Sequence, residues 1–249
     1  QLRIILPALI HLSALSTVLS VDWVTRHALT TQEYQTEHAQ WEEQGLRLRC
    51  VAGYSDSAAG GDIRYAAVWD NTTLRPQRTS HGITKSTLGI QANANSADGF
   101  RLKFINMYAV GSEVRYAAIW EPSTTPEIHL EELSGIAFEN AHQSLTGLGY
   151  QLISMGSCNV PNGESSQDLY SGVWSLADAL GSANELRFRQ SASQYQSAFD
   201  ELAGEGYRLV CLAPCTVDGE LRYNSLWKNP GGSSWWSYPD LDEANYRSE

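Results

Sequence analysis

The chain has 249 residues, of which 42% are hydrophobic and 18% are charged, so it can bury a sizeable core and is not an intrinsically disordered chain. Its 28 acidic side chains outnumber its 17 basic ones, which gives a formal net charge of −11. Nucleic-acid binding depends on Lys and Arg side chains that displace counterions. Because acidic side chains predominate, we expect no nucleic-acid partner.

The first twenty residues, 1–20, form an apolar segment in which Arg3 is the only charged residue. Small residues near its end are typical of a secretory signal peptide cleaved after Ser20. We therefore expect a secreted, extracellular protein that has no membrane partner once this segment is removed. A membrane anchor is one alternative, because a span needs ~20 apolar residues, but Pro7 and His11 disfavour it. A core helix is the other alternative.

The remaining chain repeats a pattern of about fifty residues four times. Each copy has a glycine followed by an apolar strand, and the four anchor glycines are Gly45, Gly99, Gly149 and Gly206. Each copy then reaches a block with tyrosine and tryptophan, as in Arg64-Tyr65-Ala66-Ala67-Val68-Trp69. A period of this length indicates stacked supersecondary units and disfavours a single catalytic pocket.

The repeats predict four units and the start of a fifth. Their bounds are 21–70, 71–121, 122–178 and 179–229, followed by 230–249. In the last segment Leu241, Asp242 and Tyr246 reproduce the beginning of a helix. We therefore expect this molecule to be a fragment that ends within a truncated fifth repeat.

A helix is predicted before each anchor glycine. The residue fifteen positions earlier is a good N-cap in every copy, namely Thr30, Thr84, Ser134 and Ser191. Glu33 and Gln194 complete capping boxes in the first and fourth copies. The glycine supplies the left-handed residue that ends the helix.

Two strands should follow each helix, because apolar and polar residues alternate from Leu46 to Tyr54 and again from Ile63 to Trp69. A third short segment after the tryptophan leads to the next cap, as in 75–83. We interpret the unit as one helix on an antiparallel meander. The fold class is α+β, with about four helix-plus-meander units in a solenoid or ring-like array that shares its core between neighbours.

The recurring aromatic residues are expected in that shared core. These are Tyr65, Tyr116, Tyr170 and Tyr223 with Trp69, Trp120, Trp174 and Trp227. Tryptophans that stack on sugars are the alternative, and they would lie exposed on one concave face.

An arginine row is the one candidate binding face. Arginines near the start of each of the two strands could line up across the hairpin and contact carboxylates or peptide carbonyls, and they are Arg47 with Arg64, Arg101 with Arg115, and Arg208 with Arg222. The alternative is a solvated sheet face that nearby Asp and Glu balance.

No catalytic, cofactor-binding or metal-binding residues are predicted, and no cofactor is expected. Ser225 and Lys228 match S-x-x-K, but positions three apart on a strand point to opposite sides. His38 and His142 share a repeat position, as do His27 and His81, yet a metal would need further ligands.

Four cysteines are present, and one disulfide between two of them is possible. Cys158 and Cys215 share a repeat position in neighbouring copies and could form a disulfide. Buried free thiols are the alternative for all four.

The glycine, aromatic, basic residue and leucine strand, followed by the Arg-Tyr-Ala-Ala-Val-Trp block, resembles the bacterial tandem repeat domain 1 family. This repeat also forms the N-terminal half of secreted fungal polyglycine hydrolases, and the resemblance covers residues 22–249. The third copy departs from the pattern, with Leu169 in place of arginine before Tyr170.

In those hydrolases a β-lactamase-like serine hydrolase domain follows the repeats. The resemblance therefore implies a non-catalytic, secreted repeat module that recognises or positions a protein or peptide substrate for a hydrolase domain downstream. This segment would not be an enzyme by itself. A carbohydrate-binding module or a structural or adhesion array is the alternative.

Overall fold

The computed structural model describes residues 23–56, 60–71, 75–163, 165–176 and 184–229. The signal-peptide-like segment and the start of the fifth repeat lie outside these residues. In the described part of the chain, none of the helices is long and apolar enough to cross a membrane.

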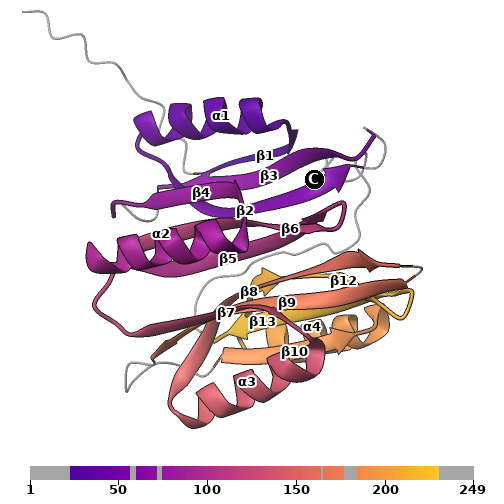
Figure 1. Ribbon diagram of the computed structural model, residues 1–249. Coiled ribbons are helices and arrows are strands. Elements are labelled where there is room, and N and C mark those ends of the chain that lie inside the picture. The colour runs from indigo at the N-terminus through magenta and orange to yellow at the C-terminus, as the bar shows by residue number, and fades with distance from the viewer. Residues whose placement is uncertain (1–22, 57–59, 72–74, 164, 177–183, 230–249) are drawn as a thin grey trace, which may run out of the picture.

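The described residues form four successive units with the same order of elements (Figure 1). The first contains β1 (Trp23–Leu29), α1 (Thr31–Glu43), β2 (Arg47–Asp56) and β3 (Asp62–Asp70). The second contains β4 (Arg78–Ile83), α2 (Lys85–Ala97), β5 (Phe100–Val110) and β6 (Glu113–Pro122). The third contains β7 (Glu127–Leu133), α3 (Gly135–Gly147), β8 (Tyr150–Asn162) and β9 (Ser165–Leu176). The fourth contains β10 (Asn184–Gln190), α4 (Ala192–Gly204), β11 (Arg208–Leu212), β12 (Cys215–Val217) and β13 (Glu220–Lys228).

Each unit is an open antiparallel sheet with its last strand in the centre. The strand orders are β1-β3-β2, β4-β6-β5 and β7-β9-β8, and β13 lies between β10 and β11 in the fourth sheet. The tandem repeat is confirmed, but the predicted meander is wrong. The segments after Trp69, Trp120 and Trp174 each pair with the last strand of the next unit, so the unit is a strand, a helix and a hairpin.

The helix ends follow the sequence. Thr30, Thr84, Ser134 and Ser191 all accept a hydrogen bond from the backbone N–H three residues later, and the first and fourth helices have complete capping boxes. The anchor glycines have φ between +82° and +90°, a left-handed conformation that costs other residues energy. In α1, Leu46 N–H donates to Trp41 O and Gly45 N–H to Glu42 O, which closes the helix with a Schellman motif.

Another left-handed residue recurs two positions before each N-cap. Ala28, Gly82, Glu132 and Arg189 have φ between +51° and +66°. At each of them the register of the first strand shifts against the central strand, as between Arg187 and Gln190. In the third and fourth units the side chain at this bulge bonds to a tyrosine of the preceding unit.

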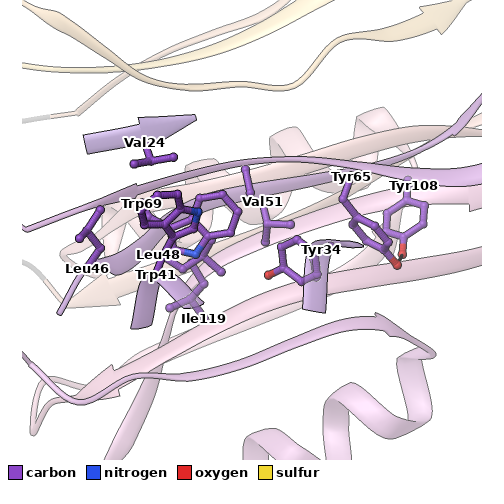
Figure 2. Close-up of a cluster of buried hydrophobic side chains, with 12 residues drawn as sticks. Val24, Tyr34, Trp41, Leu46, Leu48, Val51, Tyr65, Trp69, Tyr108 and Ile119 are labelled. Carbon is purple, nitrogen blue, oxygen red and sulfur yellow. Dashed lines mark hydrogen bonds between the residues drawn. The ribbon is translucent and has the colours of Figure 1, made fainter. Parts of the chain in front are cut away.

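The cores are shared between neighbouring units, as the repeat predicts. The first core combines Tyr34, Trp69 and other residues of the first unit with Tyr108 and Ile119 of the second (Figure 2). The next two cores likewise take residues from the following sheet. The four recurring tyrosines and four recurring tryptophans are buried, at most 4% exposed, which confirms their predicted place in the core.

Candidate functional site

The second strands of all four units meet around one cavity, which we call the strand-edge cavity. Its volume is about 350 Å³. Each of these strands lies at an edge of its sheet, so its backbone has an outer side without a neighbouring strand in that sheet. The lining comes from equivalent positions of the repeat, namely 52–55, 106–109, 157–159 and 212–214.

Small side chains form part of this lining, and close packing requires glycine at Gly53 in the lining and at Gly156 beside it. A Cβ on Gly53 would collide with the ring of Tyr108, and a Cβ on Gly156 would lie 2.8 Å from Met107 N. The second strands can therefore approach one another closely only because these positions lack side chains.

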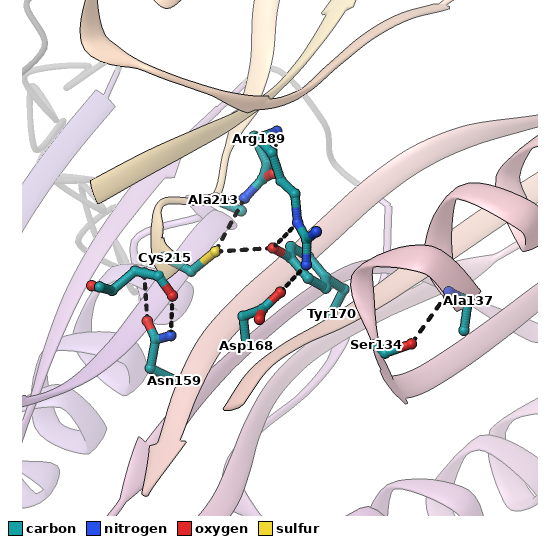
Figure 3. Close-up of polar contacts among 10 residues, drawn as sticks. Ser134, Ala137, Asn159, Asp168, Tyr170, Arg189, Ala213 and Cys215 are labelled. Atoms are coloured by element: carbon teal, nitrogen blue, oxygen red, sulfur yellow. Dashed lines mark hydrogen bonds and ion pairs between the residues drawn. The ribbon is translucent and has the colours of Figure 1, made fainter. Parts of the chain in front are cut away.

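Polar side chains bridge the second strands of neighbouring units. Gly53 N–H donates to Asn106 Oδ1 over 3.0 Å, and Ser157 Oγ donates to the carbonyl of Ala213 over 2.8 Å. The Asn159 amide accepts from Thr216 N–H and donates to its carbonyl oxygen (Figure 3). These bonds satisfy part of the exposed strand edges and fix the strands around the cavity. The sequence does not predict these contacts, because single Asn and Ser residues carry no periodic signal.

A second cavity adjoins the first, and we call it the thiol cavity. Its volume is about 290 Å³, and it shares Ala52, Asn106 and Leu212 with the strand-edge cavity. Its walls are mainly apolar, but Cys50 of the first unit and Cys211 of the fourth both line it.

The recurring tyrosines join the units. Tyr65 and Tyr108 share a hydrogen bond of 3.0 Å between their hydroxyls, and Tyr116 donates to Glu132 over 3.0 Å. Tyr170 accepts from Arg189 Nε over 3.0 Å, and Arg189 also pairs with Asp168 (Figure 3). Glu132 and Arg189 are the left-handed residues at the strand bulges. The bulge therefore positions the hydrogen-bond partner of the recurring tyrosine in the preceding unit. Burial raises the pKa values of Tyr116 and Tyr170, which keeps both hydroxyls protonated.

The six arginines of the predicted binding face do not line up. Arg47 pairs in register with Asp70, whereas Arg64 pairs with Tyr54 at the other end of the hairpin. The same separation holds for Arg101 and Arg115, and for Arg208 and Arg222. The expectation was wrong because an antiparallel hairpin places the start of one strand opposite the end of the other.

Local groups engage most of these arginines. The guanidinium of Arg47 donates to the carbonyl oxygens of Glu42 and Leu46, near the end of α1. That of Arg101 donates to those of Ser96 and Phe100. Three others pair with an acidic residue two positions earlier: Arg64 with Asp62, Arg115 with Glu113, and Arg222 with Glu220. The placement fits a charge-balanced sheet surface.

His38 has a structural partner that explains its repeat position. Trp69 Nε1 donates to His38 Nδ1 over 3.1 Å, and His38 Nε2 lies 2.9 Å from Thr79 Oγ1. Because the indole can only donate, Nδ1 must accept and the neutral ring carries its proton on Nε2. His38 therefore donates to Thr79 and cannot act as a base toward it. His142 accepts from Trp174 in the same way. Among the described residues, no three His, Cys, Asp or Glu are grouped to hold a metal ion.

The remaining candidates are buried. Ser225 is fully buried and its Oγ accepts from Trp227 Nε1 over 2.9 Å, so the S-x-x-K match has no accessible nucleophile. All four cysteines are free thiols. Cys158 packs in the core between the second and third units and Cys215 in the next core, so the suggested disulfide is not present.

These features define a tandem-repeat protein in which four strand-helix-hairpin units enclose a cavity at their strand edges. The family model described as "Polyglycine hydrolase-like, structural repeat" matches residues 20–72, 75–123 and 181–230. These matches cover more than half of the chain, and the chain belongs to this family of structural repeats. No curated protein matches the sequence. The third unit is not among the matches, yet its elements and pairing are those of its neighbours.

Proposed function

We propose that this chain is a non-catalytic, secreted module that recognises or positions a protein substrate for a serine hydrolase domain. The observation that carries the proposal is the strand-edge cavity, which equivalent segments of all four units line. A volume of about 350 Å³ lies within the usual range of ligand sites.

The lining favours an extended peptide with small side chains. Edge strands bind extended chains through backbone hydrogen bonds, and pockets beside the strand select the side chains. Here Ala52 and Ala109 present small side chains, which leave room for the backbone of a bound chain. The family description names polyglycine, so we propose a glycine-rich segment as the ligand.

Calorimetric titration with an end-blocked hexaglycine peptide tests this proposal. Binding should be measurable, and Ala52→Trp should abolish it by filling the cavity. Ala94→Trp on the exposed side of α2 is the matched control and should bind like the unchanged protein. Equal binding by both variants, or none by the unchanged protein, would contradict the proposal.

The module itself should not hydrolyse the peptide. Ser225 is buried and out of reach of a substrate. His38 donates its proton toward Thr79 and cannot activate that hydroxyl as a nucleophile. Incubation with peptide and β-lactam substrates should give no turnover. Turnover that Ser225→Ala removes would overturn this assignment.

The carbohydrate alternative receives no comparable support. A sugar-binding platform requires exposed aromatic faces, whereas Trp69, Trp120, Trp174 and Trp227 are at most 1% exposed. These four indoles cannot stack on a sugar without unfolding of their units.

A further inference from the structure

Two thiols from opposite ends of the array line the thiol cavity. Cys50 and Cys211 each follow their anchor glycine by five residues, so they occupy the same repeat position in the first and fourth units. Both are free, and both border the same cavity of about 290 Å³. The thioether-bearing Met155 of the third unit lines it as well.

The two thiols differ from the other pair of cysteines. Cys158 and Cys215 lie in separate cores and serve as packing residues beneath recurring tyrosines. Cys158 borders the strand-edge cavity, whereas Cys50 and Cys211 border the same cavity as each other, the thiol cavity. The Cys211 thiol donates a hydrogen bond to the carbonyl oxygen of Met155 over 3.2 Å, so its sulfur lies beside the third unit.

The surroundings of this cavity suit a soft, singly charged metal ion. The described lining contains no carboxylate. Its walls are mostly apolar, as at Val51 and Phe104. Its oxygen-bearing side chains are those of Thr25 and of Asn106, whose amide oxygen accepts from Gly53 N–H. Thiolate and thioether sulfurs select Cu(I) over harder ions. An apolar lining also favours a low-coordinate site, because little water is present to complete a larger shell.

We propose that Cys50 and Cys211 form a binding site for Cu(I), or for a monovalent ion of the same softness such as Ag(I). Binding replaces two S–H bonds by two S–Cu bonds and releases two protons, with no change in oxidation state. The bound ion would join the first unit to the fourth. This inference does not rest on the proposed peptide ligand.

Proton release gives the site a pH dependence. The reference pKa of a cysteine thiol is about 8.5, so a free thiol is protonated near neutral pH. Because two protons leave for each ion bound, the apparent affinity should rise about a hundredfold per pH unit in this range. Adventitious binding to surface carboxylates or histidines would not show this slope.

The test is competition for Cu(I) between the reduced protein and bicinchoninate, without oxygen. The unchanged protein should bind one equivalent of Cu(I). Cys50→Ser and Cys211→Ser should each weaken binding by about a hundredfold or more. A loss of this size exceeds the effect of changing a residue that only orients a metal ligand. Cys158→Ala is the matched control and should leave the affinity unchanged. Circular dichroism establishes that each variant is folded.

A second measurement keeps the proposal testable if a variant is unstable. X-ray absorption of the copper-loaded protein should show two or three sulfur neighbours and no nitrogen or oxygen. The proposal is overturned if the shell contains imidazole or carboxylate, or if either serine variant binds like the unchanged protein. A disulfide between Cys50 and Cys211 in the isolated protein, detected by peptide mass, would also overturn it.

Discussion

The four recurring tryptophans are equally buried, but their indole N–H groups have different partners. Histidine accepts in the first and third units, and Ser225 accepts in the fourth. In the second unit Ala92 stands at the histidine position, and Trp120 Nε1 has no hydrogen-bond partner. The histidine pair seen in the sequence therefore marks an indole acceptor, which the sequence alone did not reveal because the partner lies about thirty residues away.

Removing one acceptor should destabilise its unit. His142→Ala leaves a buried N–H of Trp174 unpaired, so the free energy of unfolding should fall by about 1–3 kcal/mol in urea titrations. In the Trp174→Phe background the same change should cost less, because no donor remains. Equal costs in the two backgrounds would show that His142 contributes only by packing.

Two histidines should give opposite pH dependences of stability. A hydrogen bond to Glu127, with Glu131 also nearby, raises the pKa of His129, whereas burial lowers that of His142. The contribution of His129 is therefore present below its unfolded pKa of 6.5 and lost as the pH rises through its folded value. The contribution of His142 is present above 6.5 and lost as the pH falls toward its lower folded value.

Urea titrations between about pH 5 and 8 measure these slopes. His129→Gln should remove a contribution to the free energy of unfolding that decreases as the pH rises. His142→Gln should remove a contribution that increases as the pH rises. Slopes of the same sign would contradict the assigned environments.

The elements that the sequence predicts best are the helices, because their ends are set by local hydrogen bonds. The caps at Thr30 and Ser191 and the left-handed Gly45 lie where the pattern places them. The strands after Trp69, Trp120 and Trp174 are predicted to complete the preceding meander, but each pairs with the last strand of the next unit. Packing on that unit selects the partner. No local signal distinguishes that partner from its neighbour in sequence.

Two glycines near α2 offer a matched test of the helix end. Gly99→Ala should cost about 1–2 kcal/mol, because φ is +82° although a Cβ would meet nothing within 4 Å. Gly89 lies inside α2, and a Cβ there would also meet nothing within 4 Å. Gly89→Ala should therefore stabilise the protein by about 1 kcal/mol. Thermal and urea unfolding of both variants measures the difference. Effects of the same sign would mean that backbone conformation does not control this helix end.

At the scale of the whole molecule, the shared cores were predictable and the cavities were not. A fifty-residue period requires neighbours to share apolar surface, and the first core does combine Trp69 with Ile119 of the next unit. The strand-edge cavity is lined by small residues such as Ala52 and Ala109, which carry no motif. It exists only because four equivalent strand edges meet, which depends on how the units stack.

We propose above all that these strand edges bind an extended glycine-rich chain. Amide hydrogen exchange with and without end-blocked hexaglycine tests it most directly, because it reports each segment separately. Added peptide should slow exchange at 52–55, 106–109 and 157–159, and leave α1 to α4 unchanged. Protection confined to the helices, or no protection at a peptide concentration that saturates binding, would show that the strand edges do not bind the chain.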